Sequence, residues 1–580
     1  EHSFSARAED NDAAWSEWAT VTAIVADADL ETVDFSTLES LDLSAGSVYY
    51  GFSTAHTGLL TLEVVAPSPP KSARIRLYAE NPQESTAAVP LAASALVDGN
   101  QRIDWSVQAG QDYYVEFYGA NPQFDARIAN LVHQEGTTVS VHGTELDDSF
   151  AFDAGNSRNL TINGVKYAFA DEEVALVQFA GGAGYNTVVL RDSPGDDHFD
   201  AWSDRATFGN NPDDGAEVFL VNVSEFAEIH AYAPAGGHNT AALYDHPQGE
   251  ESSKNNKAKA EPALGHVKLY GGGPYTRVKL FDVVDIYSSG GDDLARLFGS
   301  EGDDTFEGQM GLSRLSGPGY DVRVHGFERV IADARQAGTD IARLVDSALK
   351  DEFHGKPHKS ELFDQVTGGD VYKITARGFA EVHAEASNRE GQQADGGRDK
   401  AALWDTARDD LVRASGDQLR FYQERGELRL LYELLAFETV KVRESSGGND
   451  RAQFQGSASA DLLLGTPVYA KMVSQGRFNR AKYFDEVVVF AGGGDDRAYL
   501  YDSPGGDTLV ARPDGASFYG PGFYYALREF EGVVATASGG NDTADFHGST
   551  GADAFFASSV EAQMSGSGYF NRATGFGRVT

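Results

Sequence analysis

The sequence predicts an all-β protein in which an N-terminal β-sandwich is followed by a right-handed parallel β-helix. Two observations support this prediction. Short alternating strands separated by turn residues fill the region after the opening segment, and a cassette with glycine and aspartate corners recurs through the rest of the chain. A period of this size, built from strands and Gly/Asp turns, indicates a solenoid in which each unit packs on its neighbours.

The cassette is clearest in residues 530–555, where an alternating strand leads to a Ser-Gly-Gly-Asn-Asp corner, a short strand, a second Gly/Asp corner and an aromatic strand. Its second glycine recurs roughly every 46 to 59 residues, and an aromatic residue that opens a strand precedes most of these corners. The glycines are Gly182, Gly237, Gly291, Gly338, Gly397, Gly448, Gly494 and Gly540, and the aromatic residues are Phe226, Phe327, Phe379, Phe437, Phe484 and Phe530.

The composition limits the class of protein. The 580 residues carry a formal net charge of -41, from 47 Lys and Arg against 88 Asp and Glu. This surplus of acid argues against a nucleic-acid partner, because phosphates require a basic footprint, and it would attract cations. The chain has no cysteine, so no disulfide or thiolate metal site can brace it. No apolar run is long enough to predict a membrane span.

We expect residues 1–34 to form a lead or cap and residues 35–134 to form the sandwich. Between residues 47 and 131, short strands follow one another with turn residues between them, the pattern typical of a β-sandwich. Four segments in this region carry a resemblance to a known family: Tyr49–Phe52, Gly58–Leu62, Ile75–Tyr78 and, above all, Ala109–Gly119. They resemble the bacterial pre-peptidase C-terminal (PPC) domain, a small β-sandwich attached to secreted enzymes and surface proteins. The resemblance implies export and an accessory role, and it implies no peptidase activity.

Residues 135–580 should hold the β-helix, in about eight repeat units. Residues 247–264 and 351–370 depart from the short period, and we expect them to be inserts. Residues 427–438 suggest a helix by composition, but they occupy a strand position of the cassette, so we predict a strand there. The Asp192–Asp197 turn resembles the DSPGDD-type cassettes of large bacterial surface proteins. A chain of separate small sandwiches is the alternative, and a single cassette would bury too little surface to fold alone.

The acidic corners suggest calcium, which prefers six to eight oxygens from carboxylates and turn carbonyls. They resemble the RTX nonapeptide repeat only in part, because here the corners do not recur every nine residues. The competing interpretation is that the side chains only hydrogen-bond the turn backbone. The candidate ligands are Asp196, Asp197, Asp292, Asp293, Asp303, Asp304, Asp495, Asp496, Asp507, Asn541 and Asp542.

Catalytic residues are harder to find. The weak candidates are His354, Lys356 and His358, in the second expected insert, where a basic residue could abstract a proton from a polysaccharide. The spacing of the two histidines is that of metal ligands on a helix, but Pro357 lies between them and disfavours a helix. The competing interpretation is that all three are solvated loop residues, since no catalytic signature surrounds them.

The sequence therefore favours a secreted or cell-surface structural or adhesive protein with an acidic β-helical body. The alternative is a carbohydrate-active β-helix enzyme, such as a lyase on an acidic polysaccharide, which would need a locally basic binding groove. Self-association, other cell-surface components and an extracellular polysaccharide are the expected partners. The residues at 575–580 match the opening strand of a cassette, so we also expect either further repeats or an end-to-end contact with a second copy.

Overall fold

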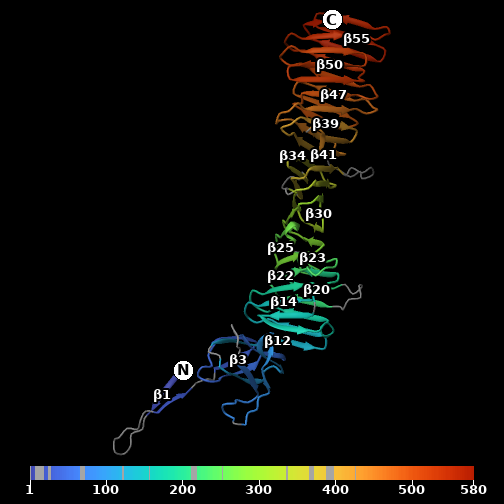
Figure 1. Cartoon of the computed structure of the whole chain (residues 1–580). Helices are drawn as coiled ribbons and strands as arrows, with labels where there is room; N and C mark the ends of the chain where they lie inside the picture. Colours follow the sequence, from blue (N-terminus) through green and yellow to red (C-terminus); the bar gives the residue numbers. More distant parts are fainter. Residues whose placement is uncertain are drawn as a thin grey trace, which may run out of the picture. The chain divides into compact units, whose positions relative to one another are not determined.

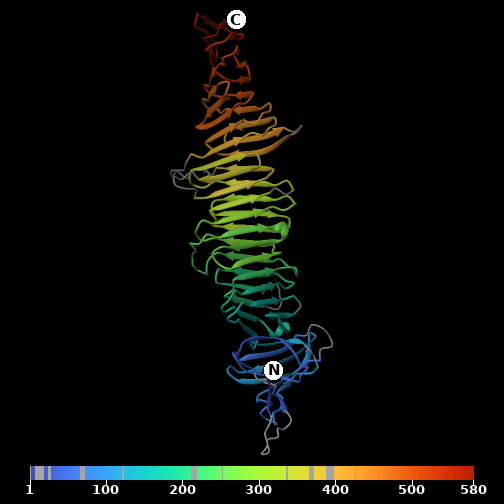
Figure 2. The same cartoon turned by 90° about the vertical axis from the view of Figure 1, so that its left-hand side faces the viewer.

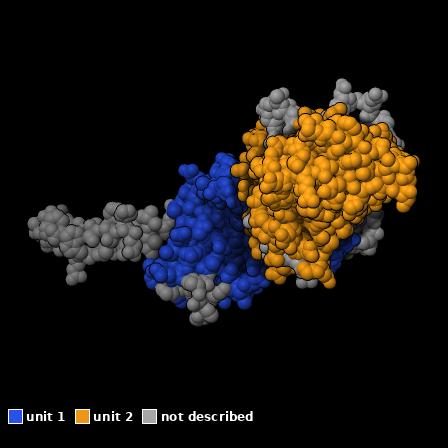
Figure 3. All heavy atoms as spheres, turned by 90° about the horizontal axis from the view of Figure 1, so that it is seen from above, with its two compact units in different colours: residues 1–240, 273–276 blue, residues 241–272, 277–580 orange. Residues whose placement is uncertain are grey.

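The structure is a computed structural model that describes residues 2–6, 19–23, 28–65, 72–85, 87–120, 123–155, 157–210, 219–247, 249–250, 253–334, 337–364, 371–386, 398–424 and 426–580. Figure 1 labels its strands. The chain is 59% strand and 1% helix, which confirms the all-β prediction. It divides into two compact units, residues 1–240 with 273–276 and residues 241–272 with 277–580 (Figure 3). The repeats form a β-solenoid of about 11 turns that is shared between the two units.

The first unit begins with two paired strands and then contains a two-layered β-sandwich. One layer has the strand order β3-β5-β11-β7-β8, and the other runs β4-β12-β6-β10-β9. Between them lies a core of apolar side chains such as Leu62, Ile75, Val115 and Phe117, all at 0% exposure. The strands are β1 (His2–Ala6), β2 (Ala19–Ala23), β3 (Ala28–Val33), β4 (Phe35–Leu41), β5 (Val48–Thr54), β6 (Gly58–Val65), β7 (Arg74–Tyr78), β8 (Ala92–Ala93), β9 (Ala95–Val97), β10 (Asn100–Val107), β11 (Asp112–Tyr118) and β12 (Phe124–Glu135).

The solenoid of the first unit follows directly, because β12 also pairs with β13. Its strands form two sheets, which we call sheet I and sheet II. Sheet I contains β13 (Thr138–His142), β17 (Leu176–Ala180), β19 (Asp197–Ala201), β20 (Arg205–Asn210) and β21 (Leu220–Ser224). Sheet II contains β14 (Ser149–Asp153), β15 (Arg158–Ile162), β16 (Val165–Phe169), β18 (Thr187–Arg191) and β22 (Glu228–Tyr232), and a short 3-10 helix, η1 (Asp171–Glu173), precedes β17.

In the second unit the same two sheets continue as stacked strands that lie side by side (Figure 2). Sheet I contains β23 (Thr240–Tyr244), β27 (Val283–Tyr287), β29 (Thr305–Gln309), β30 (Leu312–Gly317), β31 (Tyr320–His325), β33 (Ile341–Val345), β37 (Glu381–Glu385), β39 (Asp410–Ser415), β40 (Gln418–Glu424), β41 (Leu428–Leu435), β43 (Arg451–Gln455), β47 (Glu486–Phe490), β49 (Thr508–Arg512), β50 (Gly515–Gly520), β51 (Phe523–Arg528), β53 (Thr543–Phe546) and β57 (Arg578–Val579).

Sheet II of this unit is built in the same way. It contains β24 (Lys257–Glu261), β25 (His266–Tyr270), β26 (Tyr275–Lys279), β28 (Leu294–Phe298), β32 (Arg329–Asp333), β34 (Asp351–Lys356), β35 (Lys359–Asp364), β36 (Lys373–Arg377), β38 (Lys400–Trp404), β42 (Thr439–Arg443), β44 (Leu462–Gly465), β45 (Tyr469–Ser474), β46 (Arg477–Lys482), β48 (Arg497–Tyr501), β52 (Gly532–Thr536), β54 (Ala554–Ala557), β55 (Glu561–Gly566) and β56 (Tyr569–Thr574). The 3-10 helix η3 (Pro262–Leu264) joins β24 to β25.

Each cassette is a set of five strands, of which the middle three form an antiparallel meander. Strands of successive turns pair in parallel, as β43 does with β47, whereas β44, β45 and β46 pair antiparallel to one another. The solenoid prediction is confirmed, but its sheets are therefore mixed, and its hand stays a prediction. Because the three meander strands stay on one sheet, each cassette crosses between the two sheets three times, and the meander therefore lies on sheet II in one cassette and on sheet I in the next, as in β49–β51.

Both expected inserts contain regular strands. In the first, residues 257–261 form β24, with Ala258 and Ala260 buried, and residues 262–264 form η3. Residues 351–356 and 359–364 form β34 and β35, the first two strands of a sheet II meander. Both segments seemed irregular because a meander had not been expected. The helix-like stretch at 427–438 contains β41, as the cassette register predicted.

The recurring phenylalanines lie where the third meander strand crosses to the other sheet, and all of them except half-buried Phe379 are buried. Phe327, Phe437, Phe484 and Phe530 are at most 5% exposed. The meanders alternate between sheets, so Phe327, Phe437 and Phe530 follow sheet I meanders and Phe484 follows one on sheet II. The phenylalanines therefore form two alternating series.

The recurring glycines lie where one turn of the solenoid approaches the next most closely. At Gly540, φ is +111°, and a Cβ atom would lie 1.9 Å from the carbonyl oxygen of Gly505. At Gly448, a Cβ atom would lie 2.4 Å from the carbonyl oxygen of Arg408. Glycine is thus required both for the positive φ and for the backbone contact. The same crowding by backbone holds at Gly182, Gly237, Gly291, Gly338 and Gly494, and Gly397 lies outside the described residues.

We predict that Gly540→Ala destabilises the protein more than Gly522→Ala. Gly522 also has a positive φ, +77°, but nothing lies within 4 Å of its Cβ position. Gly522→Ala should cost about 1 to 2 kcal/mol from backbone strain alone, and Gly540→Ala should cost at least twice that. Urea denaturation of both variants measures the difference. Equal losses would show that close contact between turns does not explain the glycine period.

Candidate functional site

The corners of the solenoid contain a ladder of buried carboxylates and amides. The backbone N–H of Asp410 donates to Oδ1 of Asp450 on the next turn (2.7 Å), and the N–H of Asp450 donates to Oδ2 of Asp485 on the turn after that (3.0 Å). Each side chain therefore satisfies a backbone donor that would otherwise be buried without a partner. The same bond links Asp148 to Asn186, Asp197 to Asn239, Asn256 to Asp293, Asp304 to Asp340, Asp351 to Asp399, Asp461 to Asp496 and Asp507 to Asp542.

A serine or threonine four residues earlier completes most of these corners. Thr406 donates its backbone N–H to Oδ2 of Asp410 (2.8 Å) and its hydroxyl to Oδ1 (3.0 Å). In the same way, Ser503 donates its backbone N–H to Oδ2 of Asp507 (2.8 Å) and its hydroxyl to Oδ1 (3.0 Å). The corner is an Asx-type turn whose carboxylate is almost fully enclosed.

Enclosure makes these carboxylates weaker acids. Burial, together with neighbouring acidic groups, raises the pKa of Asp340 to about 6 and the pKa values of Asp399 and Asp410 to about 7. The backbone N–H that each accepts opposes this shift without cancelling it. Near neutral pH, several corners therefore sit close to the point at which they take up a proton.

The densest acidic corner combines Asp405, Glu444 and Asp450. One carboxylate oxygen from each lies within 4.8 Å of the others, and the residues are 1%, 9% and 0% exposed. Asp405 accepts the backbone N–H groups of Ser445 and Ser446, both at 2.8 Å. In contrast, Oε2 of Glu444 and Oδ2 of Asp450 are buried and accept no hydrogen bond.

Two buried carboxylate oxygens without donors cannot both stay charged unless something neutralises them. Burial, followed by the interaction between the two groups, raises the pKa of Asp450, and burial with nearby carboxylates raises that of Glu444. The pair must share a proton or hold a cation. We call Asp405, Glu444 and Asp450 the Asp450 cluster.

Two other corners bring three acids together in the same way, within the residues that the structure describes. Their members are Asp346, Asp351 and Asp399, and Asp502, Asp507 and Asp542. In the second group, the carboxylates are engaged by hydroxyl or backbone donors, such as Ser538 on Asp502 and the Asp507 N–H on Asp542. These corners show that the Asp450 cluster is one version of a repeated arrangement.

The structure separates the acidic pairs that the sequence proposed as ligands. The first aspartate of a pair faces outward: Asp292 pairs with Arg329 and Asp495 with Arg497, both at 2.8 Å. Asp196 and Asp303 instead accept backbone N–H groups of the next turn. The second aspartate is buried, as at Asp197, Asp293, Asp304 and Asp496. Of all the predicted ligands, the structure brings Asp507 and Asp542 together in a three-acid group, and Asn541 is exposed beside them.

Sequence reasoning missed the Asp450 cluster, although a signal was present. Ser446–Asp450 has the sequence Ser-Gly-Gly-Asn-Asp, identical to Ser538–Asp542, which was proposed. Asp405 and Glu444 could not be found in this way, because they come from the ends of neighbouring strands β38 and β42. Only the pairing of those strands shows that they meet.

The weak catalytic candidates lie in or beside a sheet II hairpin. His354 points outward from β34, where its Nε2 lies 2.9 Å from Oε1 of Glu352 and its ring packs edge-on against Trp404. The Lys356 ammonium lies 5.0 Å from the centre of the Trp404 ring. His358 is in the turn between β34 and β35, at φ +66°. His354 and Lys356 thus share a surface, whereas His358 belongs to the turn.

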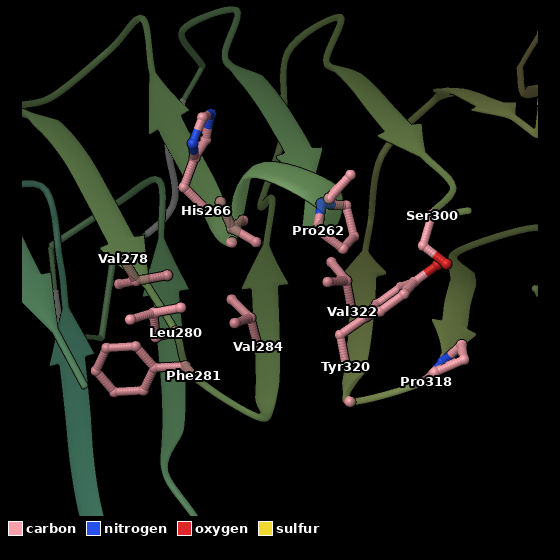
Figure 4. Close-up of a pocket in the computed structure, with 14 residues that line it drawn as sticks. Pro262, His266, Val278, Leu280, Phe281, Val284, Ser300, Pro318, Tyr320 and Val322 are labelled. Atoms are coloured by element: carbon pink, nitrogen blue, oxygen red, sulfur yellow. The ribbon is translucent and has the colours of Figure 1, made fainter. Parts of the chain in front are cut away.

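A pocket of about 320 Å³ opens beside η3 in the second unit (Figure 4). Its walls are mainly apolar, with Val278, Phe281 and Val322 among them. The polar groups at its edge already have partners: His266 Nε2 lies 2.9 Å from Glu261, and the Tyr320 hydroxyl donates to Asp304 at 2.7 Å. The pocket thus borders the acidic ladder.

Comparisons with known proteins give two distant likenesses. No family model and no curated protein matches the chain. Among solved structures, it is similar to the pre-peptidase C-terminal domain of a collagenase from Bacillus anthracis, with 12% identity and a TM-score of 0.15 over 18% of this chain and 92% of that one. It is also similar to PliG from Aeromonas hydrophila, a periplasmic inhibitor of g-type lysozyme, with 13% identity and a TM-score of 0.14 over 18% and 98% of the two chains. At TM-scores this low, neither likeness carries an argument.

No helix among the described residues is long and apolar enough to cross a membrane.

We predict that Asp340→Asn stabilises the protein at pH 7.5 but not at pH 4. The raised pKa means that the folded state favours the protonated form of Asp340. The stability that protonated Asp340 contributes is therefore present below about pH 4 and is lost as the pH rises through about 6. An amide is neutral throughout and can still accept the Asp304 N–H, as Asn186 and Asn239 do at equivalent corners. The gain at pH 7.5 should be about 1 to 3 kcal/mol, measured by denaturant unfolding at both pH values.

The reverse substitution, Asn239→Asp, is the control. It should destabilise the protein more at pH 7.5 than at pH 4, because it creates a buried acid at the same place on another turn. If neither variant changes the pH dependence, the buried ladder does not control stability.

Proposed function

We propose that the chain is an extracellular structural or adhesive protein of a cell surface, whose solenoid is strengthened by calcium at its acidic corners. The observation that carries this proposal is the Asp450 cluster, in which two buried carboxylate oxygens have no hydrogen-bond donor. A structural role is supported by the fold, because in a solenoid each turn contacts only its neighbours and stability depends on the contacts between turns. The hydrogen bonds at the acidic corners are such contacts between turns.

The oxygens of the cluster suit calcium. The ion takes six to eight oxygen ligands at 2.3–2.6 Å and accepts irregular arrangements of carboxylates and backbone carbonyls. Oδ2 of Asp450 and Oε2 of Glu444 are free to serve, and Asp405 adds a third carboxylate. Glu444 is the most exposed of the three, at 9%, and lies at the outer side of the cluster. A bound cation would remove the charge repulsion that burial enforces.

The proposed extracellular location fits a solenoid strengthened by calcium, because extracellular calcium modules typically use weak sites, with dissociation constants near 10⁻⁴ to 10⁻³ M. The absence of cysteine is compatible with export, since the fold depends on stacked turns rather than on disulfides. Self-association and binding to other surface components remain predictions of the sequence.

We predict that millimolar calcium raises the melting temperature of the protein. Binding to the folded state alone stabilises it by mass action, and magnesium should act less because it demands octahedral geometry. The double variant Glu444→Gln/Asp450→Asn should bind at least one calcium ion fewer, as measured by equilibrium dialysis, and should show a smaller thermal shift.

Asp495→Asn is the matched control for that experiment. Asp495 is an acid of a neighbouring corner, but it is 68% exposed and already paired with Arg497, so its loss should leave the calcium stoichiometry unchanged. The proposal fails if no calcium binds, or if Asp495→Asn lowers the stoichiometry as much as the double variant does.

The alternative function, a polysaccharide lyase, has a separate test. Both of its outward-facing candidates are already engaged, His354 with Glu352 and Lys356 with Trp404. We therefore expect no rise in ultraviolet absorbance from unsaturated product on incubation with alginate, pectate or glycosaminoglycans. A rise that disappears in His354→Ala or Lys356→Ala would make the chain an enzyme and contradict the structural proposal.

A further inference from the structure

The outer face of sheet II in the second unit carries three rows of positive charge, although the whole chain has a net charge of -41. In each row, three cationic side chains lie opposite one another on three adjacent strands. We call these three rows together the basic face. They are Lys268, Lys259 and Arg296; then Arg377, Lys359 and Lys356; then Lys441, Arg480 and Lys471.

The third row is the least compensated. Lys441 lies directly opposite Arg480, and Arg480 lies directly opposite Lys471, an arrangement in which like charges destabilise a sheet. Within the described residues, none of the three forms an ion pair with an acid, and Nε of Arg480 is buried without a hydrogen-bond partner. No acid offsets the repulsion within this row among the described residues, so its charge points to an anionic ligand.

Aromatic rings hold several of these lysines in place. The Lys471 ammonium lies 5.0 Å from the centre of the Phe478 ring, and that of Lys259 lies 5.4 Å from the centre of the Phe298 ring. Such cation–π contacts favour the charged form of the lysine and its position over the ring. The rings are therefore covered by cations and are poor platforms for stacking nucleic-acid bases.

The rows recur at a regular interval along the sheet. Strand pairing puts β24, β35 and β46, the middle strands of the three rows, four strand positions apart in each case. At the usual strand separation, this interval is about 19 Å. Repeated charge over such a length suits a linear polymer with regularly placed anions better than a small molecule.

Sheet I has arginines too, but acids neutralise many of them. Nε of Arg420 lies 2.8 Å from Glu433, and Nε of Arg314 lies 2.8 Å from Asp321. On sheet II, Lys259 pairs with Glu261 at 2.7 Å and Lys359 pairs with Glu361 at 2.8 Å, so among the described residues the contrast with sheet I rests on the third row.

We propose that the basic face binds a linear acidic polysaccharide with carboxylate or sulfate groups. Arginine forks and lysine ammonium groups pair with such anions, and an attraction of this kind acts locally even on an acidic protein, because charges farther away than about 8 Å are screened at physiological ionic strength. The preference for a polysaccharide over a nucleic acid rests on the proposed extracellular function. The location of the rows comes from the strand pairing and does not depend on that proposed function.

Isothermal titration calorimetry with polygalacturonate and with heparin tests the proposal, using the whole chain in EDTA so that calcium bridging plays no part. We expect binding that weakens with added salt, and no binding of neutral dextran. The triple variant Lys441→Gln/Arg480→Gln/Lys471→Gln should lose at least tenfold in affinity. It should melt no lower than the wild type, because it removes a row of like charges.

The matched control removes three positive charges from sheet I over the same turns, as Arg413→Gln/Arg420→Gln/Arg451→Gln. It should keep wild-type affinity. The proposal is overturned if neither polymer binds, if both triple variants weaken equally, or if a single-stranded oligodeoxynucleotide binds more tightly than either polysaccharide. Because calcium is absent here, these outcomes do not depend on whether the corner sites bind it.

Discussion

The hydrogen bond from a backbone N–H at one corner to a carboxylate or amide on the next turn is the interaction on which the solenoid depends. This bond fixes how one turn of the solenoid is aligned with the next at the corners, where the chain bends and the hydrogen bonds of the sheets are interrupted. The close approach of the corners that leaves space only for glycine occurs at the same places, as at Gly540. Because the acceptor is usually an acid, the bond also places negative charge where burial disfavours it. The raised pKa values and the capacity for a cation follow from this choice of acceptor.

Much of the fold could be predicted because its strongest constraint is local. The glycine period reflects close contact between backbones, which any sequence of this fold must satisfy, and the cassette register placed β41 correctly despite the helical composition of that stretch. The meander could not be predicted, since the pairing of β34 with β35 depends on contacts that no periodicity records. For the same reason, the strands β24, β34 and β35 seemed to belong to inserts at residues 247–264 and 351–370.

The candidate site was predictable only in kind. Acidic corners were visible, but the outward aspartates such as Asp495 were proposed along with the buried ones, because sequence does not show which member of a pair turns inward. The cluster with unsatisfied oxygens needs Asp405 and Glu444, which come from two paired strands. The basic face was invisible for a related reason. Lys441 comes from a different part of the sequence than Arg480 and Lys471, and only the pairing of their strands shows that the three lie in one row.

The alternation of the meander between the two sheets limits how such a chain can change in length. Loss or gain of one cassette would shift every later strand into the opposite sheet, since each cassette crosses between the two sheets three times. The lysine-rich meanders β34–β36 and β44–β46 would then lie on different sides of the molecule. Growth by duplication can preserve a continuous charged surface only when cassettes are added or removed in pairs. A duplication or deletion that keeps the charged surface continuous must therefore span two cassettes, which is twice the repeat visible in the sequence.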